Sequence, residues 1–181
     1  MKNLVFFFSL LTMFVLSSCS KDDTPGPGQE QATVSVVFSG INISEGYGST
    51  TPIYTTQLQD VLSSANKDKA PYVQAASIQN SKSYISIQGQ GAETLQKATI
   101  NLMDGTDLVW SKVLYTYNLN LSSVESDGIN DSTNPCIAFL SNIADYMAAK
   151  KSTNIQVILN AGTENVTNLK VTIHILAIFS W

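Results

Sequence analysis

The sequence contains no arginine, so all ten of its basic residues are lysines. Arginine is the side chain that most often clamps phosphate or carboxylate groups in a bidentate way and that reads guanine in DNA. The ten lysines are outnumbered by 14 acidic residues, and the formal net charge is −4. Nucleic-acid binding requires clustered cationic side chains that release counterions from phosphates. The composition therefore argues against a nucleic-acid partner and against arginine-based phosphate sites.

Histidine and cysteine are almost as scarce. His174 is the single histidine, so one chain cannot assemble a histidine-based catalytic triad or a multi-histidine zinc site. We expect it to be a structural or solvent-facing strand residue. The two cysteines are Cys19 and Cys136. Because a lipid is assigned to Cys19 below, we interpret Cys136 as a small buried apolar residue; the alternative, a reactive thiol, requires positive surroundings, and Asn134-Pro135 before it offers no charge.

An apolar run from Leu4 to Leu16 follows the single basic residue Lys2. This layout is typical of a secretory signal peptide. As a helix the run would span about 20 Å at roughly 1.5 Å per residue, which is short of a hydrocarbon core of about 30 Å. We therefore interpret residues 1–18 as a cleaved signal rather than as a transmembrane helix.

The apolar run closes with Leu16-Ser17-Ser18-Cys19 and continues with Ser20-Lys21-Asp22-Asp23. The first four residues resemble the bacterial lipobox, and the next four resemble the export tag of surface lipoproteins in the Bacteroidota. The resemblance implies that Cys19 carries diacylglycerol, with acyl chains such as palmitate, and becomes the mature N-terminus. It also implies an outer-membrane lipoprotein that faces the cell surface, with the periplasmic face as the alternative. At about 0.8 kcal/mol per buried methylene, two or more chains give a stable membrane anchor.

Residues 19–31 are predicted to be the lipidated cysteine and a flexible tether. The stretch Thr24–Gln31 has two prolines and no apolar side chain to bury, which favours extended conformers. The remaining residues, 32–181, have the length of one domain and are enough to bury a sizeable core. We expect a single β-rich domain, whose family the sequence does not reveal.

Apolar residues alternate with polar ones along several segments, which indicates half-buried strands. The segments are Val34–Phe38, Ile85–Ile87, Val113–Leu121, Ile155–Leu159 and Leu169–Phe179. Asp104-Gly105 lies between two strand-like runs and predicts a type I′ hairpin, and the stretch from Asn160 to Asn168 suggests a closing hairpin. The pattern favours a mainly β fold, an antiparallel β-sandwich of immunoglobulin-like or jelly-roll-like type. An α+β fold with a single sheet is the alternative.

Two short helices are expected among the strands. The first contains Leu58, Val61, Leu62 and Ala65 at helical spacing. The second is predicted from Pro135 to about Lys150, with Asn134 as N-cap and with Lys150 and Lys151 placed to complement the helix dipole. Its apolar stripe comprises Ile137, Leu140, Ile143, Ala144 and Met147.

Candidate sites are few and rest on short patterns. Carboxylates such as Glu93, Asp107, Glu125 and Asp145 could form a glycosidase pair, but no clustering singles any of them out. In the loop Glu125–Asn134, Asp127 and Asp131 are weak candidate ligands for Ca²⁺, and turn chemistry explains them equally well. Asp131-Ser132-Thr133 resembles the O-glycosylation motif of Bacteroidota secreted proteins, which implies a glycan on Ser132. No other metal or cofactor is expected.

Aromatic side chains could contact a ligand such as a glycan, and we expect Trp181 and Tyr47 to be the more exposed ones. We predict a non-catalytic binding or accessory lipoprotein, like those that accompany outer-membrane nutrient-uptake systems. Its partners would be the membrane, through the lipid, and an outer-membrane protein complex or a glycan. A structural or adhesive subunit resembling fimbrillins is the first alternative, and its apolar final strand, Val171–Trp181, could then pair with a partner's edge. An enzyme that uses carboxylates alone is the second.

Overall fold

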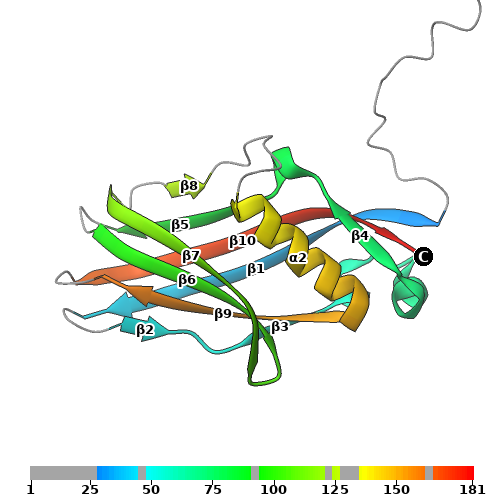
Figure 1. The fold of residues 1–181 in the computed structure, drawn as a ribbon, viewed down its shortest axis with the longest axis horizontal. Helices are drawn as coiled ribbons and strands as arrows, with labels where there is room; N and C mark the ends of the chain where they lie inside the picture. Colours follow the sequence, from blue (N-terminus) through cyan, green and yellow to red (C-terminus); the bar gives the residue numbers. More distant parts are fainter. Residues whose placement is uncertain (1–27, 45–47, 91–93, 121–123, 127–134, 162–164) are drawn as a thin grey trace, which may run out of the picture.

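The computed structural model describes residues 28–44, 48–90, 94–120, 124–126, 135–161 and 165–181, which form two stacked antiparallel β-sheets with one long helix at their side (Figure 1). The predicted β-sandwich is confirmed. The single-sheet α+β alternative is wrong, because the strands divide equally between two sheets.

Sheet A is built around the last strand of the chain, β10, which pairs along one side with β1. Along its other side β10 pairs with β4 and then with β5, and β5 pairs with β8. The bounds are β1 Gln29–Ile43, β4 Ala75–Ile78, β5 Tyr84–Gln90, β8 Val124–Ser126 and β10 Val166–Ser180.

Sheet B is built around β9, which pairs with β6 on one side and with β2 and β3 in succession on the other; β6 pairs in turn with β7. The bounds are β2 Gly48–Thr50, β3 Tyr54–Gln57, β6 Thr94–Asp104, β7 Asp107–Asn120 and β9 Ser152–Asn160. If β2 with β3, and β4 with β5, each count as one strand, the orders are 1-8-3-6 and 2-7-4-5. These orders correspond to a jelly roll rather than an immunoglobulin fold.

The core lies between the sheets and follows the predicted alternation. Val34, Val36 and Phe38 in β1 are buried, while the residues between them face outward. In β10 all six predicted inward positions are buried: Leu169, Val171, Ile173, Ile175, Ala177 and Phe179. Since successive strand residues face opposite sides of a sheet, this period of two indicated which face meets the core.

Helix α2, Pro135–Lys150, has the predicted bounds and packs mainly against β4 and β9. The five residues of its predicted stripe are all buried. Lys151 follows in the left-handed conformation, φ 65°, and its Nζ donates hydrogen bonds to the carbonyl oxygens of Val73 and Ala148. A lysine that satisfies a last-turn carbonyl suits the negative end of the helix dipole, as predicted. The predicted N-cap, Asn134, lies outside the described residues.

The first predicted helix is much shorter than expected. Helix α1 spans only Leu58–Val61; Gln57 before it makes no side-chain cap, and Leu62 after it is extended. Leu58 and Leu62 are both buried, and α1 contacts β1 and β3. The spacing of these apolar residues therefore reflects their burial and not a long helix. Two 3₁₀ helices, η1 Lys67–Tyr72 and η2 Asn80–Lys82, complete the chain's described helical segments.

Two turn predictions are also wrong in detail. Asp104 pairs with Asp107, so the two-residue turn is Gly105-Thr106, one position later than predicted. Only Gly105 in this turn has a positive φ, 60°, which excludes type I′ and fits type II′. The stretch after Asn160 does not close a hairpin, because β9 and β10 belong to different sheets. Their connection crosses the sandwich, which local turn chemistry cannot reveal.

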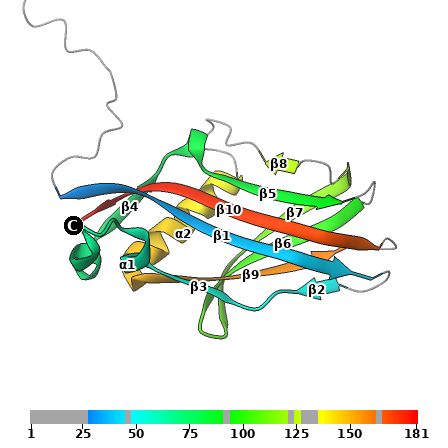
Figure 2. The same cartoon turned by 180° about the vertical axis from the view of Figure 1, so that it is seen from behind.

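The first and last described residues lie side by side at one end of the sandwich (Figures 1 and 2). The backbone N–H of Trp181 donates to the carbonyl of Gly28 at 2.9 Å. Gly28 has a φ of 77°, and a Cβ added there would lie 3.0 Å from the Trp181 carbonyl oxygen, so glycine is required. Strand β1 thus begins at Gln29, three residues before the expected start of the domain.

Candidate binding surface on the β6–β7 hairpin

Three consecutive large apolar side chains are exposed at the start of β7. Leu108 is 58% exposed, Val109 is 37% exposed and Trp110 is 52% exposed. We call these three residues the hairpin patch. Single exposed apolar residues are common on protein surfaces, whereas three in succession that include a tryptophan are typical of an interaction site. Trp110 pairs with Leu102 and Leu108 pairs with Met103, so Trp110 and Leu108 lie on opposite faces of the hairpin.

The position of β7 explains this exposure. Among the described residues β7 pairs with β6 alone, so it is an edge strand of sheet B. Trp110 lies opposite Leu102 and Leu108 lies opposite Met103, which leaves Val109 as the extra residue of a β-bulge. Bulges bend and twist an edge strand. The closed end of the β6–β7 hairpin projects past β3 and β9 in both views (Figures 1 and 2).

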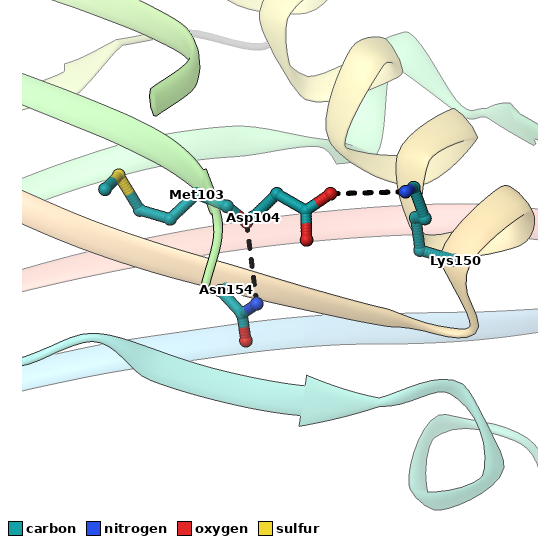
Figure 3. A network of polar contacts seen from close by, with 4 residues as sticks. All are labelled: Met103, Asp104, Lys150 and Asn154. Carbon is teal, nitrogen blue, oxygen red and sulfur yellow. Dashed lines mark hydrogen bonds and ion pairs between the residues drawn. The ribbon is translucent and has the colours of Figure 1, made fainter. Parts of the chain in front are cut away.

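Polar contacts join the closed end of the hairpin, at Met103 and Asp104, to the body of the domain (Figure 3). Nζ of Lys150, at the end of α2, lies 3.2 Å from a carboxylate oxygen of Asp104. The side-chain amide of Asn154, in β9, donates to the carbonyl of Met103 at 3.5 Å. Lys150 also lies 5.9 Å from the centre of the Tyr146 ring. These contacts join the end of β6 to α2 and to β9.

The same contacts shift the pKa values of Asp104, Lys150 and Tyr146. A hydrogen bond from Lys150 and a second from Tyr146 lower the pKa of Asp104 below its ordinary value of 3.8. The hydrogen bond to Asp104 raises the pKa of Lys150 above 10.5. Burial first, and then the hydrogen bond to Asp104, raises the pKa of Tyr146 above 10.0. At neutral pH Asp104 and Lys150 therefore form a charged pair beside the neutral phenol of Tyr146.

The sequence alone did not predict that the β6–β7 hairpin carries a candidate binding surface. The sequence favours Trp181 and Tyr47, and not Trp110, as the exposed aromatic residues, and it offers Asp107 only as one possible acid of a catalytic pair. The structure pairs Asp107 with Asp104 across the hairpin, and both are exposed. The apolar pattern of residues 108–110 predicted a strand, but only the placement of β7 at a sheet edge makes these side chains accessible.

Most of the residues predicted to carry function lie outside the described residues: Cys19, Tyr47, Glu93, Asp127, Asp131 and Ser132. Glu125 lies in β8. Asp145 is exposed on α2, and Cys136 is half-buried near the start of that helix, not fully buried as expected. His174 is half-buried on β10 and stacks on Tyr84, with ring centres 4.9 Å apart, which fits the structural role predicted for it.

Trp181 is less exposed than the sequence suggested. It is half-buried and packs against the core. It also lies at the end of β10 that meets the start of β1, whereas Tyr47 falls between the end of β1 and the start of β2. Fifteen strand residues at roughly 3.3 Å each make β1 about 50 Å long, so Trp181 lies far from the other end of β1, at Ile43, and Tyr47 lies outside the described residues.

Depressions elsewhere in the described part of the chain include the following two. One, of about 400 Å³, lies between β4 and α2, and Asp145 is the one ionisable residue among those that line it. The other, of about 360 Å³, lies beside η1 and is lined by Lys67, Asp68 and Lys151 among others. Within the described ranges, no three His, Cys, Asp or Glu side chains gather closely enough to hold a metal ion. No described helix has the length and hydropathy needed to cross a bilayer.

Comparison with known proteins gives little further information. No family model matches the chain, and no curated protein matches it. Among solved structures, a chain from turnip yellow mosaic virus is similar with 9% identity and a TM-score of 0.33, over 87% of this chain and 83% of that chain. A chain from Desmodium yellow mottle tymovirus is similar with 10% identity and a TM-score of 0.30, over 87% and 91%. Both likenesses are too weak to bear on function.

Proposed function

We propose that the protein is a membrane-anchored, non-catalytic accessory lipoprotein that docks a partner protein through the hairpin patch. The observation that carries this proposal is the exposure of Leu108, Val109 and Trp110 on an edge strand, next to a turn that contacts α2 through Asp104 and Lys150. A hydrophobic patch on a rigid support loses little conformational entropy when a partner covers it. The partner would belong to an outer-membrane assembly such as a nutrient-uptake complex.

Anchoring at Cys19 is the part of the proposal that comes from the lipobox resemblance. The ten residues from Cys19 to Gly28 are joined by nine Cα–Cα steps, which span at most about 30 Å. The lipid would then hold the domain on the outer membrane, at the cell surface or on the periplasmic side, by the end at which Gly28 meets Trp181. The hairpin patch lies away from that contact and is accessible to a membrane-bound partner (Figure 1).

The anchor can be tested by metabolic labelling with an alkyne fatty acid. The full-length protein should incorporate the label and sediment with outer membranes, and the substitution Cys19→Ser should abolish both. Cys136→Ser is the matched control and should change neither. Protease treatment of intact cells then distinguishes the cell surface from the periplasmic face, and an unlabelled wild-type protein would refute the anchor.

Docking can be tested separately by a native pull-down from detergent-solubilised membranes with a C-terminal tag. Trp110→Ser should abolish recovery of the partner. Tyr72→Ser is the control, because Tyr72 is 66% exposed and lies outside the hairpin patch. Equal recovery with both variants would refute the hairpin patch as the docking surface.

A structural or adhesive subunit is the second candidate, and strand β1 is the observation that favours it. The prediction that the final strand offers an edge is wrong, because β10 lies between β1 and the β4–β5 pair. Among the described residues, β1 pairs with β10 alone, and its segment from Ala32 to Ser39 carries no charge and no proline. Such an edge can accept another strand. Val37→Lys should then impair assembly or adhesion.

A further inference from the structure

The six residues at the start of β7 have a charge pattern that complements itself when one copy is reversed. The segment reads Asp107-Leu108-Val109-Trp110-Ser111-Lys112, with an acid at one end, a base at the other and apolar residues between them. Two copies of this segment can pair antiparallel so that Asp107 of each copy lies opposite Lys112 of the other. This register contains two such opposite-charge pairs. The same register places Val109 opposite Trp110 at the centre of the contact.

The strand register puts both charges on the same face of sheet B. Lys112 pairs with Ile100, and Asp107 pairs with Asp104, four residues further along β6. Residues at even spacing on a strand lie on the same face of the sheet, so Ile100 and Asp104 lie on one face. Residues paired across two strands also lie on the same face, so Lys112 and Asp107 lie on that face as well. A twofold axis perpendicular to the sheet keeps this face aligned in both copies, so each aspartate can reach a lysine without crossing the sheet.

A second copy is the occupant that this pattern fits best. A twofold interface is isologous, so a surface that complements itself satisfies both halves of the contact at once. Opposite charges directly across antiparallel strands are favourable, whereas like charges there are unfavourable. The pairing would also cover three apolar side chains and an edge that, in the described part of the chain, pairs only with β6.

We propose that the partner docked by the hairpin patch is a second copy of this chain, joined edge to edge through antiparallel β7 strands. The inference rests on the proposed docking function and specifies its partner. The contact is small, so it is weak in dilute solution. Confinement of two lipid-anchored copies to one membrane raises their effective concentration and makes the pair form there.

Charge reversal tests the register with the full-length protein in detergent, using two tagged copies and co-purification across a concentration series. Asp107→Lys alone, or Lys112→Asp alone, should weaken self-association roughly tenfold, because each creates two like-charge pairs. The double variant Asp107→Lys/Lys112→Asp should restore it. A mixture of the two single variants should also associate, because each then supplies the charge that the other lacks. Lys170→Asp, an exposed change on β10, is the control and should have no effect.

Cysteine pairs test the same register on native membranes. In a Cys136→Ser background, Leu108→Cys and Ser111→Cys should form a disulfide with each other when co-expressed. Leu108→Cys with Lys170→Cys should not form one. Monomeric protein at every concentration, or equal effects from the single and the double charge variants, would overturn the second copy as partner. If another protein is still recovered in a Trp110-dependent way, the docking function survives this failure; if nothing is recovered, both proposals fall.

Discussion

Among the described residues, β1 and β7 are long strands at one edge of their respective sheets, but they present different surfaces. Strand β1 buries Val34, Val36 and Phe38 and exposes Ser35 and Val37 between them. Its open side also lies near β3, where the Tyr54 ring meets the Phe38 ring edge to face at 6.1 Å. Strand β7 instead begins with three exposed apolar residues. The exposed apolar residues of β7 are the reason that we propose β7, and not β1, as the docking surface.

A second difference lies in how each strand is held in place. Glu30, in β1, accepts hydrogen bonds from the backbone N–H of Ser63 at 2.7 Å and from the side-chain amide of Asn66 at 2.8 Å. The hairpin that contains β7 is held by the contact of Asp104 with Lys150 on the protein surface. Substitutions at Glu30 and at the buried positions of β1 should therefore affect folding, and substitutions of the hairpin patch should affect the proposed binding.

The largest expected effect comes from neighbouring valines in β1. Val36 is 1% exposed, so Val36→Asp buries a carboxylate without a partner, at a cost of several kcal/mol, and should unfold the domain. Val37 is 41% exposed, so Val37→Asp should change the free energy of unfolding by less than about 1 kcal/mol. Urea denaturation followed by circular dichroism measures both. Equal stability of the two variants would contradict the assignment of the two faces.

The difference in burial between Val36 and Val37 could be predicted from the sequence, because the alternation of apolar and polar residues in β1 placed Val36 on the inward face. The same applies to α2, where proline at the first position, an apolar stripe and terminal lysines all agree. Local patterns of this kind predict an element when packing only reinforces them.

Features that depend on contacts between elements far apart in the chain could not be predicted from the sequence. Leu58 and Leu62 form a pattern that a helix or a buried loop can produce equally well. Nothing near Asn160 indicates that β9 and β10 enter different sheets, and nothing in Leu108–Trp110 indicates an edge. The candidate site was missed for this last reason, since an apolar run in a central strand would have been buried.

The next largest effect concerns Glu30. Glu30→Ala removes the acceptor for Ser63 and Asn66 and should lower the free energy of unfolding by about 1–2 kcal/mol. Thr33→Ala, an exposed change in the same strand, is the control and should cost less than about 0.5 kcal/mol. Equal losses in the two variants would show that Glu30 does not hold the segment around Ser63.

A smaller effect should follow the pH. The lowered pKa of Asp104 means that its contact with Lys150 stabilises the fold fully above pH 3.8 and loses this contribution as the pH falls through the folded-state pKa. The raised pKa of Lys150 means that the contribution present below pH 10.5 is lost as the pH rises through its folded-state value. Lys150→Met should move the pKa of Asp104 back towards 3.8 in an NMR titration, and Asp145→Asn should not. An Asp104 carboxyl that already titrates at 3.8 in the wild type would contradict the contact.

The smallest effect on stability should come from the residue that we expect to matter most for binding. Trp110 is 52% exposed, so Trp110→Ser should change the free energy of unfolding by only about 0.5 kcal/mol. The same substitution should remove the centre of the proposed β7–β7 contact and abolish both partner recovery and self-association. A tryptophan retained on the surface for stability would show the reverse, a loss in urea denaturation with binding intact. Measuring both quantities on one variant therefore separates a residue that serves the fold from one that serves a partner.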